Sequence, residues 1–84
     1  MPATHFSFWL TDRMMRLGLS RVDVAKAVRV KPGSVRTWMR GTAAPKDADR
    51  PALAIVLEVP LADLTTRIAS SAWTEREARS GGAA

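Results

Sequence analysis

The sequence contains no cysteine and a single histidine, His5. Without cysteine the chain forms neither disulfide bonds nor thiolate metal sites, and this fits a reducing compartment. One histidine without a partner builds neither a metal cluster nor a Cys–His catalytic pair, and no other acid–base constellation is present. We therefore expect no enzyme activity, no metal and no cofactor. His5 itself is expected to be a solvated residue of a flexible leader, residues 1–5.

Long hydrophobic runs are also missing. The longest unbroken apolar run, residues 52–57, is six residues long, whereas a membrane-spanning helix needs about 20. No basic, then apolar, then small-residue leader opens the chain. These features predict a cytoplasmic protein that does not enter a membrane, and no small-molecule ligand is evident.

Positive charge is present, and it is concentrated. Thirteen Lys and Arg against eight Asp and Glu give a formal net charge of +5. Residues 20–46 hold seven of the basic residues and one acid, Asp23, so this segment carries +6 and the remainder −1. A basic surface concentrated on one part of a small domain is typical of a protein that binds a polyanion. The alternative is a solvated surface that happens to be rich in arginine.

Apolar residues recur at helical spacing, and no segment alternates as a strand would. The spacing predicts helices over residues 6–17, 21–28 and 32–40. Gly18 supplies the left-handed stop of the first helix, and Pro32 suits the first position of the third. The residues expected to face the core include Trp9, Val24, Ala25, Val28, Val35, Trp38, Met39, Leu53, Ala54 and Leu57.

Two more helices are predicted in the second half of the chain. Asp47 or Asp49 would cap the fourth helix, with Pro51 in its first turn. The fifth follows Pro60 and has three residues on its inner face: Leu61, Leu64 and Ile68. Beyond it, Thr74 and Glu77 would cap one last turn.

The fold class is therefore all-α, with five short helices in one domain. This domain covers residues 6–70. Residues 71–84 form a C-terminal extension that is either partly disordered or involved in a dimer.

Two short helices with a tight break between them, inside a basic segment, describe a helix-turn-helix unit. In this respect residues 10–64 resemble the Cro/C1 (Xre-type) repressor domain, a compact five-helix DNA-binding fold. The resemblance rests on residue types at matching places: Ala25, Val30, Val35, Trp38, Arg40-Gly41, Pro45, Leu53-Ala54, Leu57, Val59 and Leu64. It implies that helix 32–40 enters the major groove of double-stranded DNA.

This chain departs from the family pattern at two places. The family usually has glycine in the turn where this chain has Arg29, so the turn requires either a left-handed arginine or a different geometry. The first two residues of the recognition helix, which often read bases in the family, are Pro32 and Gly33 here. Base contact is then expected from Lys31, Ser34, Arg36, Thr37 and Arg40, with Gly33 allowing close backbone approach. Arg36 is the candidate for a guanine and Thr37 for a thymine methyl group.

A second set of residues is expected to contact phosphates. Ser20 is followed three residues later by Asp23, a capping box at the start of helix 21–28, and a helix N-terminus favours an anion. The resemblance places the phosphate anchor here and on the far side of the recognition helix. The residues expected to touch phosphates are Ser20, Arg21, Arg29, Thr42 and Lys46.

A homodimer is expected, at least on DNA, because two subunits on a palindromic operator combine their contacts. Ile55 and Val56 are candidates for the dimer contact, although additional core packing explains them equally well. Trp73 either folds back near Phe6 or docks a second subunit.

The sequence thus predicts a nucleoid-associated transcriptional regulator, most simply a small bacterial, phage or prophage repressor that acts by occupying its operator. One alternative is a DNA-binding antitoxin or interaction module whose C-terminal tail engages a protein partner. Another is a non-specific nucleoid-binding protein.

Overall fold

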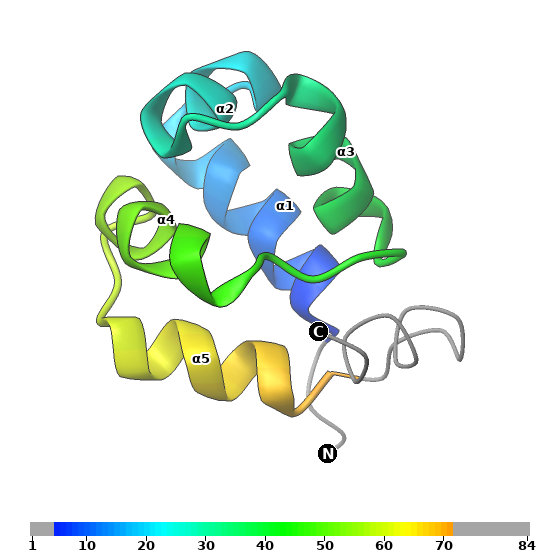
Figure 1. Ribbon diagram of the computed structural model, residues 1–84, viewed down its shortest axis with the longest axis vertical. Helices are drawn as coiled ribbons and strands as arrows, with labels where there is room; N and C mark the ends of the chain where they lie inside the picture. The colour runs from blue at the N-terminus through cyan, green and yellow to red at the C-terminus, as the bar shows by residue number, and fades with distance from the viewer. Residues whose placement is uncertain (1–4, 72–84) are drawn as a thin grey trace.

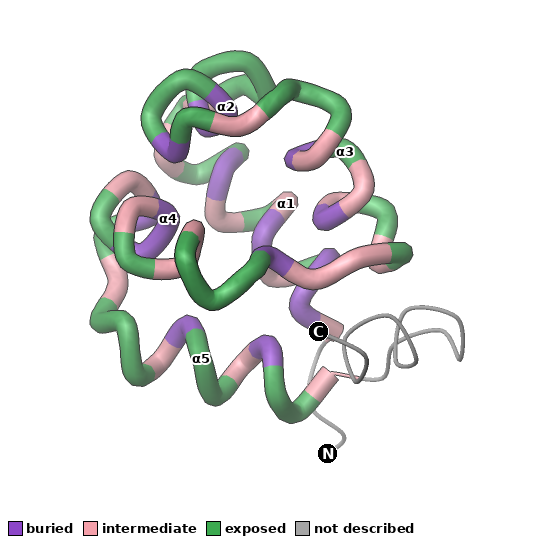
Figure 2. The backbone as a smooth tube through the Cα atoms, in the orientation of Figure 1, coloured by how far each residue is buried: buried purple, intermediate pink, exposed green. Residues whose placement is uncertain are grey.

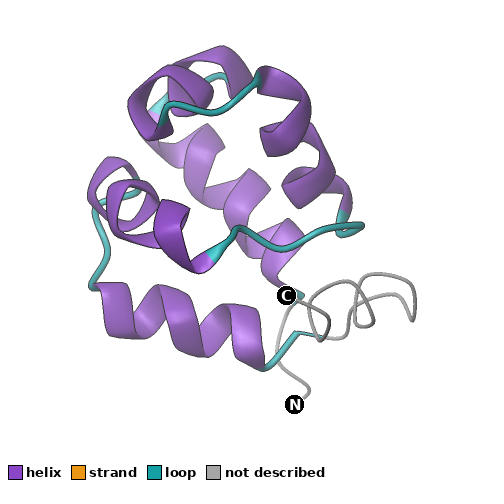
Figure 3. Ribbon diagram, in the orientation of Figure 1, coloured by secondary structure: helices purple, strands orange, loops and turns teal. Residues whose placement is uncertain are grey.

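The computed structural model describes residues 5–71, and over this range every regular element is a helix (Figures 1 and 3). The α-helices are α1 (Phe6–Leu17), α2 (Arg21–Val28), α3 (Pro32–Arg40), α4 (Arg50–Val56) and α5 (Leu61–Ala69). A single 3-10 turn, η1 (Asp47–Asp49), precedes α4. The all-α, five-helix prediction is confirmed, and the first three helices have the predicted bounds. Trp73, Thr74 and Glu77 lie outside the described residues.

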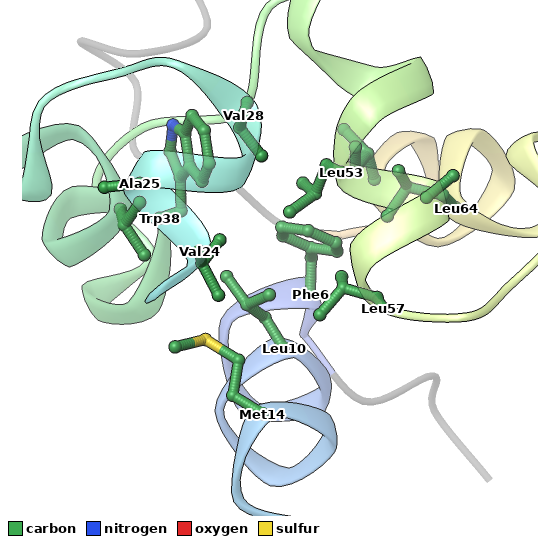
Figure 4. Close-up of a cluster of buried hydrophobic side chains, with 13 residues drawn as sticks. Phe6, Leu10, Met14, Val24, Ala25, Val28, Trp38, Leu53, Leu57 and Leu64 are labelled. Atoms are coloured by element: carbon green, nitrogen blue, oxygen red, sulfur yellow. The ribbon is translucent and has the colours of Figure 1, made fainter. Parts of the chain in front are cut away.

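The core lies where α1 meets the other helices (Figures 2 and 4). Phe6 and Leu10 of α1 are fully buried between α2 on one side and Leu53, Leu57 and Leu64 of the second half on the other. α2 packs against both α3 and α4, α1 packs against α3, and α4 packs against α5. This arrangement buries one side of every helix and leaves the other side of each in solvent.

The first helix begins with a histidine cap that the sequence did not reveal. His5 is the N-cap of α1, where its ring Nδ1 accepts a hydrogen bond from the backbone N–H of Ser7 at 3.0 Å. The expectation of a solvated, unpartnered leader residue was therefore wrong for His5. Imidazole is not among the usual N-cap groups, so residue preferences gave no signal here.

The same ring lies close to the glycine that ends α3. Gly41 ends that helix at φ 78°, and a Cβ at this position would lie 3.0 Å from the His5 ring and 3.1 Å from the Ser7 hydroxyl. Glycine is thus favoured by its left-handed conformation and by the little space left for a side chain. The C-terminus of α3 therefore approaches the N-terminus of α1 closely.

Two further local predictions were wrong. Neither Asp47 nor Asp49 makes a side-chain cap, because residues 47–49 form the 3-10 turn and Asp47 pairs instead with Arg50 at 3.1 Å. Leu61 does not share the buried face of Leu64 and Ile68, since 44% of it is exposed. Leu61 is the first residue of α5, whereas Leu64 and Ile68 lie one and two turns further along the helix. Trp9 and Met39, which were expected in the core, are half-buried against it.

An arginine of α1 binds the C-terminal end of α4. The Arg13 guanidinium donates to the backbone carbonyls of Leu57 at 2.9 Å and Glu58 at 3.3 Å. A cation at the C-terminus of a helix satisfies carbonyls without an intrahelical partner and opposes the negative end of the helix dipole.

In the described part of the chain, none of the helices is long and apolar enough to cross a membrane.

Candidate nucleic-acid interface

α2 and α3 are joined by residues 29–31 and pack against each other. Val35 and Trp38 are the buried side of α3, with 0% and 3% of their surface exposed. Residues three, four and seven positions apart share a helix face. The outer face of α3 therefore carries Gly33, Arg36 and Arg40, all of them exposed.

The predicted base-contacting residues lie on or beside this outer face. Lys31, the N-cap residue of α3, is exposed and makes no side-chain cap. Ser34 and Thr37 are half-buried, and the Thr37 hydroxyl donates a hydrogen bond to the Ser34 carbonyl at 2.6 Å. α3 thus offers long basic side chains, and the hydroxyl proton of Thr37 is already used inside the helix.

The predicted phosphate anchor at the start of α2 is built as a complete capping box. The Ser20 hydroxyl accepts from the Asp23 N–H at 3.1 Å, and the Asp23 carboxylate accepts from the Ser20 N–H at 2.8 Å. The N–H groups of Arg21 and Val22, in the first turn, have no partner within the helix. They and the Ser20 hydroxyl proton remain able to donate to a phosphate.

Because of the capping box, we expect the stability of the protein to vary with pH in the acidic range. Hydrogen bonds from Ser20, first from its backbone N–H and then from its side chain, lower the pKa of Asp23. Because the pKa of Asp23 is lower in the folded state than in the unfolded state, its ionised form stabilises the fold at pH values above the unfolded pKa, near 3.8. This contribution to the free energy of unfolding is lost as the pH falls through the folded-state pKa. In urea titrations, the free energy of unfolding of the wild type should therefore exceed that of Asp23→Asn at pH 6, and the two values should converge at strongly acidic pH. An equal difference at both pH values would contradict the assignment.

Arg29 resolves the question of the turn in favour of a left-handed arginine. It has φ 65° and ψ 45°, and the next residue's N–H bonds to the Ala25 carbonyl at 3.0 Å. The only other non-glycine residue with positive φ among residues 5–71 is Glu58, at φ 58° after α4. Such a conformation costs a side-chain-bearing residue roughly 1 kcal/mol or more.

Glycine at either position should relieve this cost. We expect Arg29→Gly and Glu58→Gly each to raise the free energy of unfolding by about 1 kcal/mol, measured by urea denaturation. Only Arg29→Gly should also weaken binding to duplex DNA, because it alone removes a cation from the segment 20–46. Equal weakening by both variants would contradict the prediction that the Arg29 charge contributes to binding.

The basic residues divide into two groups according to their partners. All seven in residues 20–46 are exposed, and none forms an ion pair or donates a side-chain hydrogen bond to any described residue. These residues, here named the free basic set, are Arg21, Lys26, Arg29, Lys31, Arg36, Arg40 and Lys46. Lys26 has only a weak electrostatic effect on Asp23.

The described arginines outside residues 20–46 are all engaged within the chain. Arg13 binds the two carbonyls at the end of α4, as above. Arg16 pairs with Asp12 at 2.8 Å, Arg50 with Asp47 at 3.1 Å and Arg67 with Asp63 at 3.1 Å. Sequence reasoning located the excess charge but did not find this division, which depends on contacts between side chains.

A different kind of surface lies between α1 and α5. An open groove of about 570 Å³ is lined by residues of these two helices, including Phe8, Trp9, Asp12 and Asp63. Phe8 is 69% exposed, while Trp9 is covered by the Arg67 guanidinium, 4.8 Å from its ring centroid. The groove belongs to helices that carry none of the free basic set.

The structure separates the two dimer candidates on α4. Ile55 is 78% exposed, whereas Val56 is half-buried and packs against the core. Val56 is therefore accounted for by core packing, as the alternative allowed, and Ile55 stays a candidate. Trp73, the third candidate, is outside the described residues.

Comparisons with protein-family models, curated proteins and solved structures find no significant match to this chain. Within the described residues, no group of three or more His, Asp or Glu side chains is placed to hold a metal ion.

Proposed function

We propose that this protein is a sequence-specific, double-stranded-DNA-binding transcriptional regulator, most simply a small repressor that acts as a homodimer on a palindromic operator. α3 is the element that enters the major groove, which is about 12 Å wide and admits an α-helix. The division of the basic residues carries the proposal. Seven cations on and around α2 and α3 have no ion-pair or side-chain hydrogen-bond partner among residues 5–71, whereas the described arginines elsewhere do.

The geometry of α2 and α3 supports this function more than it supports the alternative of a solvated surface that is merely rich in arginine. Val35 and Trp38 anchor α3 through its inner side, so its outer face is presented without competing contacts. At the start of α2, unpartnered N–H groups accompany Arg21, and such a helix N-terminus is suited to a backbone phosphate. The two kinds of contact needed for a specific complex, to bases and to phosphates, are thus supplied by neighbouring helices.

The direct test is a titration of labelled duplexes from around the protein's own gene against scrambled duplexes at two salt concentrations. Specific binding predicts at least one natural fragment with a preference of about tenfold or more, a threshold set well below the roughly 10³-fold or greater preference that specific DNA-binding proteins typically show. A smaller preference for every fragment would favour non-specific nucleoid binding instead.

The groove between α1 and α5 favours a second candidate function, the antitoxin-like module with a protein partner. Its exposed Phe8 is the kind of side chain that anchors a protein contact. If the regulator function holds, deletion of residues 72–84 and Phe8→Ser should both leave DNA affinity unchanged within about twofold. Loss of DNA binding in either variant would shift the assignment toward the interaction module.

A further inference from the structure

We propose that the operator is read through guanine and through the thymine methyl group, and that adenine and cytosine are not read directly. This inference rests on the proposed function and specifies the chemistry of the same site. It follows from which hydrogen-bonding groups the chain has and which of them the fold leaves available.

Direct readout of adenine needs a side chain that donates and accepts at once. Adenine presents N7 as acceptor and N6 as donor in the major groove, and the amide of Asn or Gln matches this pair. The chain contains neither Asn nor Gln at any position. No amide on α3 or elsewhere therefore provides this bidentate contact, and the half-buried hydroxyl of Ser34 can bond to any base edge and so does not select adenine.

Direct readout of cytosine needs a free acceptor for its N4 amino group, which Asp or Glu supplies. Asp23 is the only acid in residues 20–46, and its carboxylate accepts the Ser20 N–H at 2.8 Å. It lies in the first turn of α2 and not on α3. The recognition face thus has no carboxylate for cytosine.

The long side chains that remain on this face are donors. Arg36 and Arg40 are exposed, have no ion-pair partner among the described residues, and are one helical turn apart. Guanine is the base with two acceptors, O6 and N7, on its major-groove edge, and a guanidinium donates to both. Four residues of helix rise about 6 Å, and base steps are about 3.4 Å apart. The two arginines therefore match guanines within about two base steps of each other.

Thr37 contributes an apolar contact. Its hydroxyl proton is used by the Ser34 carbonyl at 2.6 Å, so the oxygen can only accept from a base. A single accepted bond does not distinguish adenine N6 from cytosine N4, whereas the methyl group of Thr37 is a match for the C5-methyl of thymine. Thymine is thus the second base with a specific partner on α3.

The experiment starts with selection of duplexes from a random 20-base-pair pool by the full-length protein at 0.15 M salt. The enriched duplex is then resynthesised with base analogues that keep the pairing partner of the base they replace. 7-Deazaguanine removes N7, inosine keeps O6 and N7, deoxyuridine lacks the thymine methyl, and 7-deazaadenine removes N7 of adenine. We expect at least a tenfold loss with 7-deazaguanine at one position, a severalfold loss with deoxyuridine, and no change with inosine or 7-deazaadenine.

Protein variants assign these effects to residues by a double-mutant cycle. In Arg36→Ala the 7-deazaguanine effect at one position should fall below twofold. Thr37→Val keeps a methyl group and should retain the preference for thymine over uracil, whereas Thr37→Ser should lose it. Circular dichroism of each variant checks that the helices are intact.

The outcomes separate this inference from the proposed function. If no sequence is enriched above the pool, both are wrong. If a sequence is enriched but tolerates 7-deazaguanine, or loses affinity with 7-deazaadenine, the inference is overturned and the proposed function stands.

Discussion

Replacing Trp38 with alanine is expected to unfold the protein or leave it marginally folded. Trp38 is 97% buried, since only 3% of its surface is exposed, and it lies between α3 and the residues of α2 that Figure 4 shows around it. Removing a buried aromatic side chain costs about 3–5 kcal/mol. Domains have about 0.05–0.15 kcal/mol of stability per residue, or about 4–13 kcal/mol for a chain of this length, so the loss equals the whole stability at the lower end of this range and a large part of it elsewhere.

The measurement is thermal and urea denaturation followed by circular dichroism, with Phe8→Ala as the matched control. Phe8 is also an aromatic residue on a helix, but it is 69% exposed, so its removal should change stability by no more than about 0.5 kcal/mol. A Trp38→Ala variant with the wild-type melting temperature would contradict the packing described for α3. So would a larger loss from Phe8→Ala than from Trp38→Ala.

Removing three members of the free basic set should nearly abolish DNA binding at moderate salt without unfolding the protein. We consider the triple variant Arg21→Ala, Arg29→Gly and Lys46→Ala, whose residues are exposed and have no partners among residues 5–71. Each neutralised phosphate contributes about −0.9 to the slope of log affinity against log salt. If about four phosphates are contacted per subunit, the wild-type slope is about −3.6, and the triple variant should reduce it to about −0.9.

The expected loss of affinity at 0.1 M salt is about 500-fold, because the three lost contacts change the exponent by about 2.7. The matched control removes three arginines outside residues 20–46, namely Arg16, Arg76 and Arg79. Both triple variants have a formal net charge of +2 instead of +5. Equal salt slopes for the two variants would show that total charge, and not its position around α2 and α3, governs binding.

The first three helices were predictable because their boundaries are set by local signals. Gly18, the Ser20–Asp23 capping box and Gly41 each act within a few residues of their own position. α4 was harder, because its N-terminus has no side-chain cap and is preceded by a 3-10 turn. The His5 cap was missed since histidine is rare in this role, and its contact with Gly41 joins residues far apart in the chain.

Within the candidate site, the identity of the polar residues on α3 could be predicted, but their availability could not. The spacing of Val35 and Trp38 is enough to place Arg36 and Arg40 on the outer face of a helix. That the Thr37 proton is bound by the Ser34 carbonyl depends on a rotamer, which spacing does not specify. From the sequence, the turn at Arg29 could have had either a left-handed arginine or a different geometry. The left-handed conformation is the one found in the structure, where α3 packs against α2.

By itself the sequence determined the helical class, the capping and turn signals, the place of the excess charge, and the lack of any amide side chain for adenine. Three of the bound arginines pair with an acid three or four residues away, as helical spacing allows, and tertiary structure decided only the partners of Arg13. Arg13 is bound to the carbonyls of Leu57 and Glu58, about 44 residues away along the chain, whereas Arg36 has no such neighbour among the described residues. The physical reason is that a cation's partner is whatever group lies within a few ångströms in space, and only packing brings such groups together.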